Sequence, residues 1–181
     1  MHNNIYSSKQ NKYNYIFDLD NTLIYTDALN NLAYNYALSC FGLNSIKDTQ
    51  RITREIIRNK YPHLSQLEID NISQLKQDYF KQNLIKTNCN KSLVKFLRQQ
   101  DPNQCMLWTS ADKNRTLELL KYYQLNHHFT GVLFSPKENI DEDIQKLTAN
   151  LNCANDELII FDDNELVINE LPKLGVNIIA T

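Results

Sequence analysis

Five short apolar runs, each bounded by polar or small residues, constrain the fold of this chain more than any other feature. Near-continuous runs of four to six apolar residues are typical of strands buried on both faces of a parallel sheet. A helical pattern precedes each of the last four runs. This alternation predicts an α/β fold with an open, doubly wound parallel sheet. The runs span residues 13–20, 105–110, 131–136, 157–163 and 176–181, and the helical patterns span 91–100, 113–125, 141–151 and 164–175.

The alternation fails once, between the first and second runs. From about Ala28 to Thr87 the sequence shows only helical periodicity, with Leu32, Tyr36 and Cys40 spaced to share one helix face. These sixty residues are too many for an ordinary crossover, so we expect a separate helical subdomain set over the sheet. The expected division is a core of residues 1–24 and 89–181 and a helical cap of residues 25–88.

Composition narrows the class of partner. The chain has 181 residues, of which 42% are hydrophobic, and this suits one well-buried core with an elaboration. A net charge of −2 gives no basic field for a nucleic acid polymer or an anionic membrane, so a small-molecule partner is expected. No apolar run approaches the ~20 residues of a membrane span, and no secretory leader is evident. We therefore expect a cytoplasmic protein.

Two carboxylates end the first apolar run. In a strand, residues two apart point to the same side, so Asp18 and Asp20 would converge at its carboxyl end. Buried together they would repel, and a divalent cation such as Mg²⁺ would remove that cost. The alternative is a turn or helix-cap pair, because DLDNT is rich in turn-forming residues.

The stretch FDLDNTL, residues 17–23, resembles the first signature of the haloacid dehalogenase-like (HAD) superfamily of aspartate-nucleophile phosphatases. Three further family motifs can be matched in order. CMLWTS ends in Thr109 and Ser110, where the family more often has Asn at the second position. Lys137 lies 26 residues before Asp163, and ELIIFDDN supplies Asp162 and Asp163. The resemblance covers the chain from about residue 13 to its end, outside the helical insert, and implies a Rossmann-like core.

The resemblance implies a role for each of these residues. Asp18 would be the nucleophile that forms an aspartyl phosphate, and Asp20 the general acid and base. The Thr109 hydroxyl and the Ser110 amide would bind phosphoryl oxygens, while Lys137 would neutralise charge in the transition state. Lys146 is the alternative lysine, but it falls in the middle of a helical pattern.

A metal site is also implied by the resemblance. Asp18, the backbone carbonyl of Asp20, and Asp163 with Asp162 beside it would hold Mg²⁺. The fourth motif departs from the frequent GDxxxD pattern, because Asp replaces Gly and Val167 stands where the trailing Asp would fall. The departure puts the tuning of metal affinity in doubt and leaves open which of Asp162 and Asp163 dominates.

Trp108 and three arginines remain to be interpreted. Trp108 lies within a buried strand pattern and is expected in the core. Arg51, Arg54 and Arg58 are three and four apart, so they would share one face of a helix. Such a face is usually solvated, but it would meet an anionic substrate if the helix overhung the site.

The sequence therefore predicts a Mg²⁺-dependent phosphatase that acts on a small phosphate monoester. Segments 107–125 and 161–179 are similar in style to the pyrimidine 5′-nucleotidases, which makes a nucleoside monophosphate the leading expectation. A sugar phosphatase or a phosphomutase on the same core is one alternative. A non-catalytic protein that binds a phosphorylated ligand is the other. The expected hinges of the cap are residues 24–27 and 87–90.

Overall fold

A five-stranded parallel sheet forms the centre of the structure, a computed structural model that describes residues 12–47 and 51–181. Its strand order is β5-β4-β1-β6-β7. Each strand falls within one of the five apolar runs, which confirms the predicted α/β sheet. The strands are β1 (Asn14–Phe17), β4 (Cys105–Thr109), β5 (Gly131–Phe134), β6 (Leu158–Asp162) and β7 (Asn177–Ala180).

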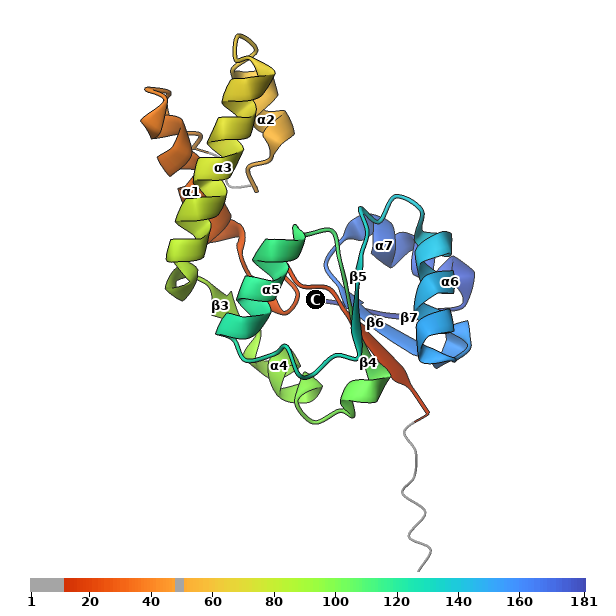
Figure 1. The fold of residues 1–181 in the computed structure, drawn as a ribbon. Helices are drawn as coiled ribbons and strands as arrows, with labels where there is room; N and C mark the ends of the chain where they lie inside the picture. Colours follow the sequence, from red (N-terminus) through yellow and green to blue (C-terminus); the bar gives the residue numbers. More distant parts are fainter. Residues whose placement is uncertain (1–11, 48–50) are drawn as a thin grey trace, which may run out of the picture.

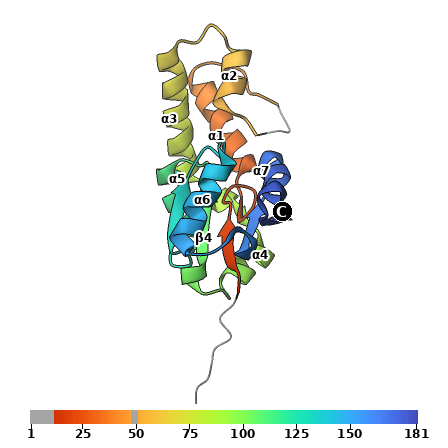
Figure 2. The same cartoon turned by 90° about the vertical axis from the view of Figure 1, so that its right-hand side faces the viewer.

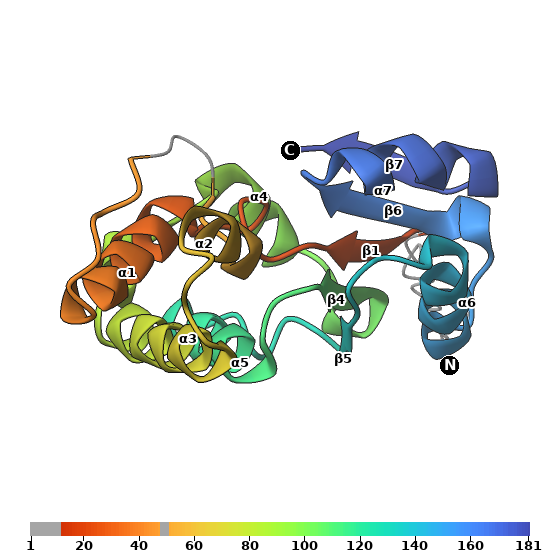
Figure 3. The same cartoon turned by 90° about the horizontal axis from the view of Figure 1, so that it is seen from above.

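Helices cover both faces of this sheet (Figures 1 and 3). Alternate strand residues serve the two sides, because successive side chains of a strand point in opposite directions. Phe17, Leu107 and Phe161 pack with α4 (Lys91–Leu97) and α5 (Lys113–Tyr122). On the other face, Ile16, Trp108 and Ile160 pack with α6 (Ile140–Leu151) and α7 (Glu165–Glu170). Trp108 is completely buried, which confirms its expected place in the core.

The order of the strands marks where a ligand would bind. After β1 the chain passes to β4 and β5 on one side of it, and then returns to build β6 and β7 on the other. The direction of winding therefore reverses beside β1, and open α/β sheets bind ligands beyond the carboxyl ends of the strands at this point. Asp18 directly follows β1 at that edge.

Three helices lie beyond this end of the sheet (Figures 1 and 2). The chain leaves the sheet through β2 (Ile24–Tyr25) and returns through β3 (Asn88–Cys89), which pairs antiparallel with β2. This ribbon coincides with the two expected hinge segments. Between its strands lie α1 (Asp27–Cys40), α2 (Arg54–Lys60) and α3 (Gln66–Gln82).

The inserted helices have a core of their own, in which Leu38 of α1, Ile57 of α2 and Ile72 of α3 pack together. Leu32, Tyr36 and Cys40 share one face of α1, as their spacing predicts, but this face is not the buried one. Leu32 and Tyr36 are about half exposed, and the helix instead buries Leu29, Ala33, Ala37 and Leu38. Apolar residues occur on several sides of α1, so the spacing of apolar residues alone does not identify which side is buried. Tyr36 stacks on Tyr79 of α3 with ring centroids 4.5 Å apart.

No helix within residues 12–47 and 51–181 combines the length and the apolar character needed to cross a membrane.

Candidate active site

Three of the expected site residues end neighbouring strands. Asp18 follows β1, Thr109 ends β4 and Asp162 ends β6. The backbone amide of Asp18 donates to the carbonyl of Phe161 at 2.9 Å, which extends the pairing of β1 and β6 to the two carboxylates. Asp18 is only 5% exposed and Asp162 is fully buried. Two acids so enclosed require compensating positive charge.

Lys137 supplies that charge. Its Nζ donates to Asp18 Oδ1 and to Asp162 Oδ2, each at 2.6 Å, and the residue is 3% exposed. Lys146, the alternative lysine, is half exposed on α6 and pairs with Glu142 one turn earlier. The structure therefore brings Lys137 to the two acids and leaves Lys146 outside the site.

Sequence reasoning did not identify the groups that hold Lys137. Its φ is +60°, a left-handed conformation that costs energy unless the surroundings fix it. Its backbone amide donates to Ser135 Oγ at 3.1 Å, and the Ser135 hydroxyl in turn donates to Asp143. Trp108 Nε1 also donates to Asp143, at 3.1 Å, and the Lys137 ammonium lies 4.8 Å from the centroid of a Trp108 ring. Asp143 thus anchors the loop from inside the fold.

Replacing Asp143 with alanine is expected to lower the free energy of unfolding by about 2–3 kcal/mol, because the Trp108 and Ser135 donors would lose a buried acceptor. Urea unfolding measures this loss. The matched control is Asp141→Ala, an exposed acid of the same helix, which should cost less than about 1 kcal/mol. Equal losses in the two variants would contradict the anchoring role.

Asp20 is held by three donors of a different kind. Thr26 Oγ1 donates to Oδ1 at 2.6 Å, while Arg51 at 3.3 Å and Arg115 both bond Oδ2. Burial acts to raise the pKa of Asp20, but Arg115, Arg51 and the Thr26 hydroxyl outweigh it and hold the pKa below its usual value. Asp20 is therefore a carboxylate in this arrangement.

Asp18 is in the opposite electrostatic situation. Burial raises its pKa to about 7, the charge of Asp162 adds to the rise, and Lys137 opposes it. One ammonium does not fully compensate two buried acids. Additional positive charge at these carboxylates would favour the ionised form that a nucleophile needs.

Sequence reasoning placed Arg51 wrongly and missed Arg115. Arg51 was expected to share a helix with Arg54 and Arg58, but α2 begins at Arg54, after an N-cap in which the Thr53 hydroxyl accepts from the amide of Ile56. Arg51 precedes the helix and reaches Asp20 and Asp27 instead. Arg115, in the first turn of α5, had no motif to mark it.

A polar cavity of about 360 Å³ opens over these residues. Four carboxylates (Asp18, Asp20, Asp162 and Asp163) and three cations (Arg51, Arg115 and Lys137) line it, together with Ser110. Thr109 lies below the surface, almost fully buried, where its Oγ1 accepts from the amide of Ala111 at 3.1 Å. The cavity has the mixed charge required to bind a phosphate ester beside a nucleophilic acid.

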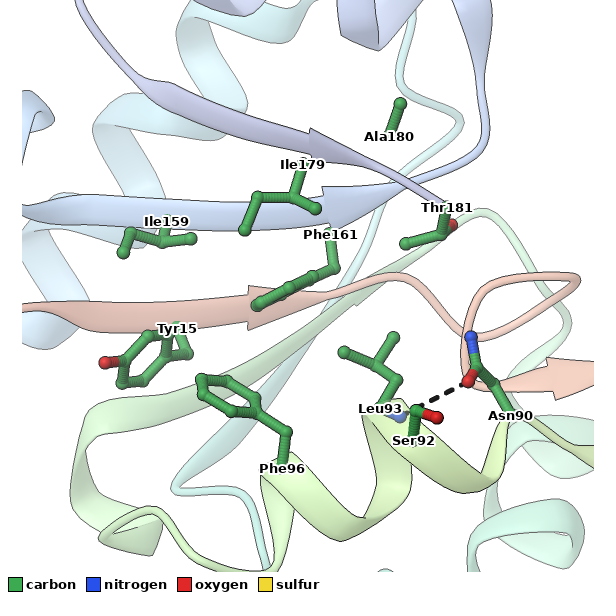
Figure 4. A pocket seen from close by; sticks show the side chains of 10 residues that line it. All are labelled: Tyr15, Asn90, Ser92, Leu93, Phe96, Ile159, Phe161, Ile179, Ala180 and Thr181. Atoms are coloured by element: carbon green, nitrogen blue, oxygen red, sulfur yellow. Dashed lines mark hydrogen bonds between the residues drawn. The ribbon is translucent and has the colours of Figure 1, made fainter.

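The larger cavity, of about 610 Å³, is unsuited to this chemistry. Figure 4 shows the rings of Tyr15, Phe96 and Phe161 lining it, with Ile159 and Ile179 nearby. None of its ten lining residues is an acid, a lysine or an arginine. A phosphate dianion would find no compensating charge there.

The carboxylates of Asp18, Asp162 and Asp163 fit a hard cation. Each offers an oxygen within 4.8 Å of the others, and Mg²⁺ prefers such ligands. Both oxygens of Asp162 already accept hydrogen bonds, from Lys137 and from the amide of Asn164 at 2.9 Å. Asp163 lines the cavity and is exposed on that side. Partial desolvation, followed by repulsion from Asp162, raises the pKa of Asp163.

Comparisons with known proteins agree with this geometry. The family model of the haloacid dehalogenase-like hydrolases matches residues 15–181. No curated protein sequence matches the chain. Among solved structures, a predicted phosphoglycolate phosphatase from Haemophilus somnus is similar with a TM-score of 0.79 at 14% identity, covering 94% of this chain and 86% of that one.

Two other solved structures share the fold. CbbY from Rhodobacter sphaeroides, in complex with phosphate, has a TM-score of 0.74 at 16% identity and covers 92% of this chain and 84% of its own. A haloacid dehalogenase-like hydrolase from Streptococcus pneumoniae has a TM-score of 0.69 at 19% identity, covering 93% and 84%. At these identities the likeness concerns the fold.

Proposed function

The chain belongs to the haloacid dehalogenase-like hydrolase family, and on this basis we propose that it is a phosphatase that hydrolyses a small phosphate monoester through a phosphorylated Asp18. One observation carries the proposal. The Lys137 ammonium lies between two buried carboxylates at the ends of neighbouring strands, beside a cavity of about 360 Å³. Few arrangements other than binding and transfer of an anionic group account for such charge at a strand end.

In the first step, an oxygen of Asp18 attacks phosphorus and the bond from phosphorus to the ester oxygen breaks. Lys137 offsets the negative charge of the phosphoryl oxygens, and its contact with Asp18 Oδ1 aligns the nucleophile. The Ser110 amide and the Thr109 hydroxyl are proposed to bind the phosphoryl oxygens. The position of Thr109 supports this role, because Thr109 is buried next to Ser110, which lines the cavity.

Asp20 serves the proton transfers. It delivers a proton to the departing ester oxygen, and in the second step it takes one from the water that breaks the aspartyl phosphate. The contacts that keep Asp20 ionised support the second task. For the first task Asp20 must first take up a proton from solvent, and this becomes easier when the bound ester shares Arg51 and Arg115 with Asp20, since both cations line the same cavity.

Mg²⁺ is the proposed cofactor. Asp18 and Asp163 would hold it together with Asp162 and the backbone carbonyl of Asp20, and it would supply positive charge between nucleophile and phosphate. Asp163, which lines the cavity, is proposed as the better ligand, because hydrogen bonds occupy both oxygens of Asp162.

Removing divalent cations with EDTA is expected to abolish hydrolysis of p-nitrophenyl phosphate, and added Mg²⁺ should restore it. In Asp163→Asn the Mg²⁺ concentration for half-maximal activity should rise by about tenfold or more, because a ligand is lost. Asp156→Asn, an exposed acid at the far end of β6, serves as the control and should not change it. Unchanged metal dependence in Asp163→Asn would contradict this assignment.

Residues 25–88 are proposed to act as a cap that closes over the phosphoryl site and excludes bulk water. The ribbon of β2 and β3 is the proposed hinge, because it is the covalent connection between the two parts. Arg51 supports this role, since it belongs to the inserted segment and already contacts Asp20.

Substrate identity is tested by a panel of nucleoside monophosphates and sugar phosphates, assayed with Mg²⁺ for release of inorganic phosphate. The nucleoside monophosphate favoured by the sequence remains a proposal, with a sugar phosphate as its rival. Transfer of phosphate to a sugar phosphate without release would identify a phosphomutase. Saturable binding without any turnover on the panel would overturn the phosphatase and favour a binding protein.

A further inference from the structure

A second cavity, of about 290 Å³, adjoins the proposed catalytic cavity beneath the inserted helices. The two cavities share the lining residues Ser110, Ala111, Arg51 and Arg115, so they are adjacent at these side chains. An ester whose phosphate lies at Asp18 would extend its alcohol part in this direction. The side chains that line the second cavity would therefore contact the leaving group and determine which leaving groups bind.

Lys76 of α3 is a buried lysine with no acid partner among the residues that the structure describes. It is 8% exposed and lines the second cavity. Its Nζ lies 5.2 Å from the ring centroids of both Tyr34 and Phe80, and none of the described acids lies within ion-pair distance of it. Burial, followed by the charges of Arg115 and Arg51, lowers the pKa of Lys76 to about 7. An anion in the cavity would relieve this cost.

Arg115 has an unused donor at the same place. The residue is 9% exposed, and its guanidinium bonds Asp20 through Nη2. Its Nη1 is buried and has no hydrogen-bond partner among the residues that the structure describes. Buried donors are seldom left unpaired, so this atom indicates a missing acceptor. The Arg115 guanidinium also lies 5.4 Å from the Phe80 ring, which it therefore shares with Lys76.

The remaining charges of the second cavity do not cancel this excess. Arg54 adds a further cation at its rim. Among the described residues, Asp112 is the only acid in its lining, and the Asp112 carboxylate caps α5 by accepting from the amide of Arg115 at 3.0 Å. Arg51 is already paired with Asp20 and Asp27. Lys76 and Arg54 thus line this cavity with one carboxylate that is already engaged, and Arg115, which carries the unpaired Nη1, belongs to the same lining.

We propose that the second cavity binds an acidic group on the alcohol part of the substrate, so that the enzyme acts on small phosphate monoesters that carry a second phosphate or a carboxylate. Lys76 supplies the charge, and Arg115 Nη1 supplies a hydrogen bond. This inference rests on the proposed phosphatase function, because it places the phosphate ester at Asp18. It favours acidic leaving groups over uncharged nucleosides.

Matched pairs of esters test the inference. Propane-1,3-diol bisphosphate is compared with the monophosphate, and 3-(phosphonooxy)propanoate with its amide. For the wild type, kcat/KM should be at least about tenfold higher for one or both acidic members, since buried donors reject a ligand that leaves them unpaired. The two pairs distinguish a second phosphate from a carboxylate. Equal kcat/KM within both pairs would overturn the inference.

Variants locate the effect. Lys76→Met should reduce the acidic-to-neutral ratio by about tenfold or more, whereas Lys60→Met, an exposed lysine of α2, should leave it unchanged. Arg54→Gln, compared with the exposed Arg58→Gln of the same helix, provides a second pair should Lys76→Met fail to fold. An acidic-to-neutral ratio that survives in the folded cavity variants would overturn the inference.

A binding measurement separates this inference from the proposed function. Isothermal titration calorimetry of Asp18→Asn measures the affinities for the bisphosphate and the monophosphate of propane-1,3-diol. The difference between them gives the contribution of the second cavity, because this variant does not turn the esters over. Tighter binding of the bisphosphate, weakened by adding Lys76→Met, supports the anion site even if the wild type hydrolyses no ester. Equal binding of the two ligands would overturn the anion site whatever the hydrolytic activity.

Discussion

Replacing Asp18 with asparagine is expected to lower kcat for p-nitrophenyl phosphate by about 10⁴-fold or more, because an amide cannot serve as the attacking oxygen. Asp18 lies at the end of β1 with Lys137 Nζ at 2.6 Å, and its position at the cavity makes it the carboxylate that an incoming phosphate would meet. The substitution preserves shape and removes one charge. Lys137 retains its contact with Asp162, so the variant should fold.

The control for Asp18→Asn is Asp156→Asn, which removes a charge far from the cavity and should retain wild-type turnover. Circular dichroism and a melting curve establish that both variants are folded. A folded Asp18→Asn variant with more than about one per cent of wild-type kcat would contradict the nucleophilic role.

Replacing Lys137 with methionine is expected to affect both stability and activity. Without Mg²⁺, the free energy of unfolding should fall by about 3 kcal/mol, because Asp18 and Asp162 would remain buried without their cation. With Mg²⁺, kcat/KM should fall by about 10²–10³-fold, because the positive charge on the transferring group is lost. Urea unfolding and steady-state kinetics measure the two effects.

Lys146→Met is the matched control for this variant. Lys146 is half exposed and pairs with Glu142 on its own helix, so its loss should cost less than about 1 kcal/mol and leave kcat/KM unchanged. Equal effects of the two substitutions would contradict the assignment of Lys137. A Lys137→Met variant that is inactive but as stable as the wild type would show a catalytic role for Lys137. It would contradict the expected contribution of Lys137 to stability.

The sheet was predictable from the sequence because its strands are buried on both faces. Such strands require near-continuous apolar runs, and the runs of β1, β4 and β6 end beside the cavity. Asp18 was located by the end of its apolar run, whereas Thr109, Lys137 and Asp162 were matched through the resemblance to the family's motifs. The covalent order of the chain carried this information.

The groups that surround the acids were not predictable in the same way. Arg115 bonds Asp20 although the two residues are 95 positions apart in the sequence. Arg51 also bonds Asp20, and it precedes α2 because Thr53 is the N-cap of that helix. Asp143 supports the Lys137 loop from the buried side of an amphipathic helix. Each contact depends on how elements pack, which local patterns do not specify.

Trapping the phosphorylated enzyme tests the central claim most directly. Wild type is mixed with Mg²⁺ and excess p-nitrophenyl phosphate, quenched in acid within the first turnovers, and digested for mass spectrometry. The account predicts one added phosphoryl group on Asp18, labile to hydroxylamine as an acyl phosphate is, and more of it in Asp20→Asn, whose second step lacks its base. A phosphoryl group on another residue, or full turnover by Asp18→Asn, would contradict the account.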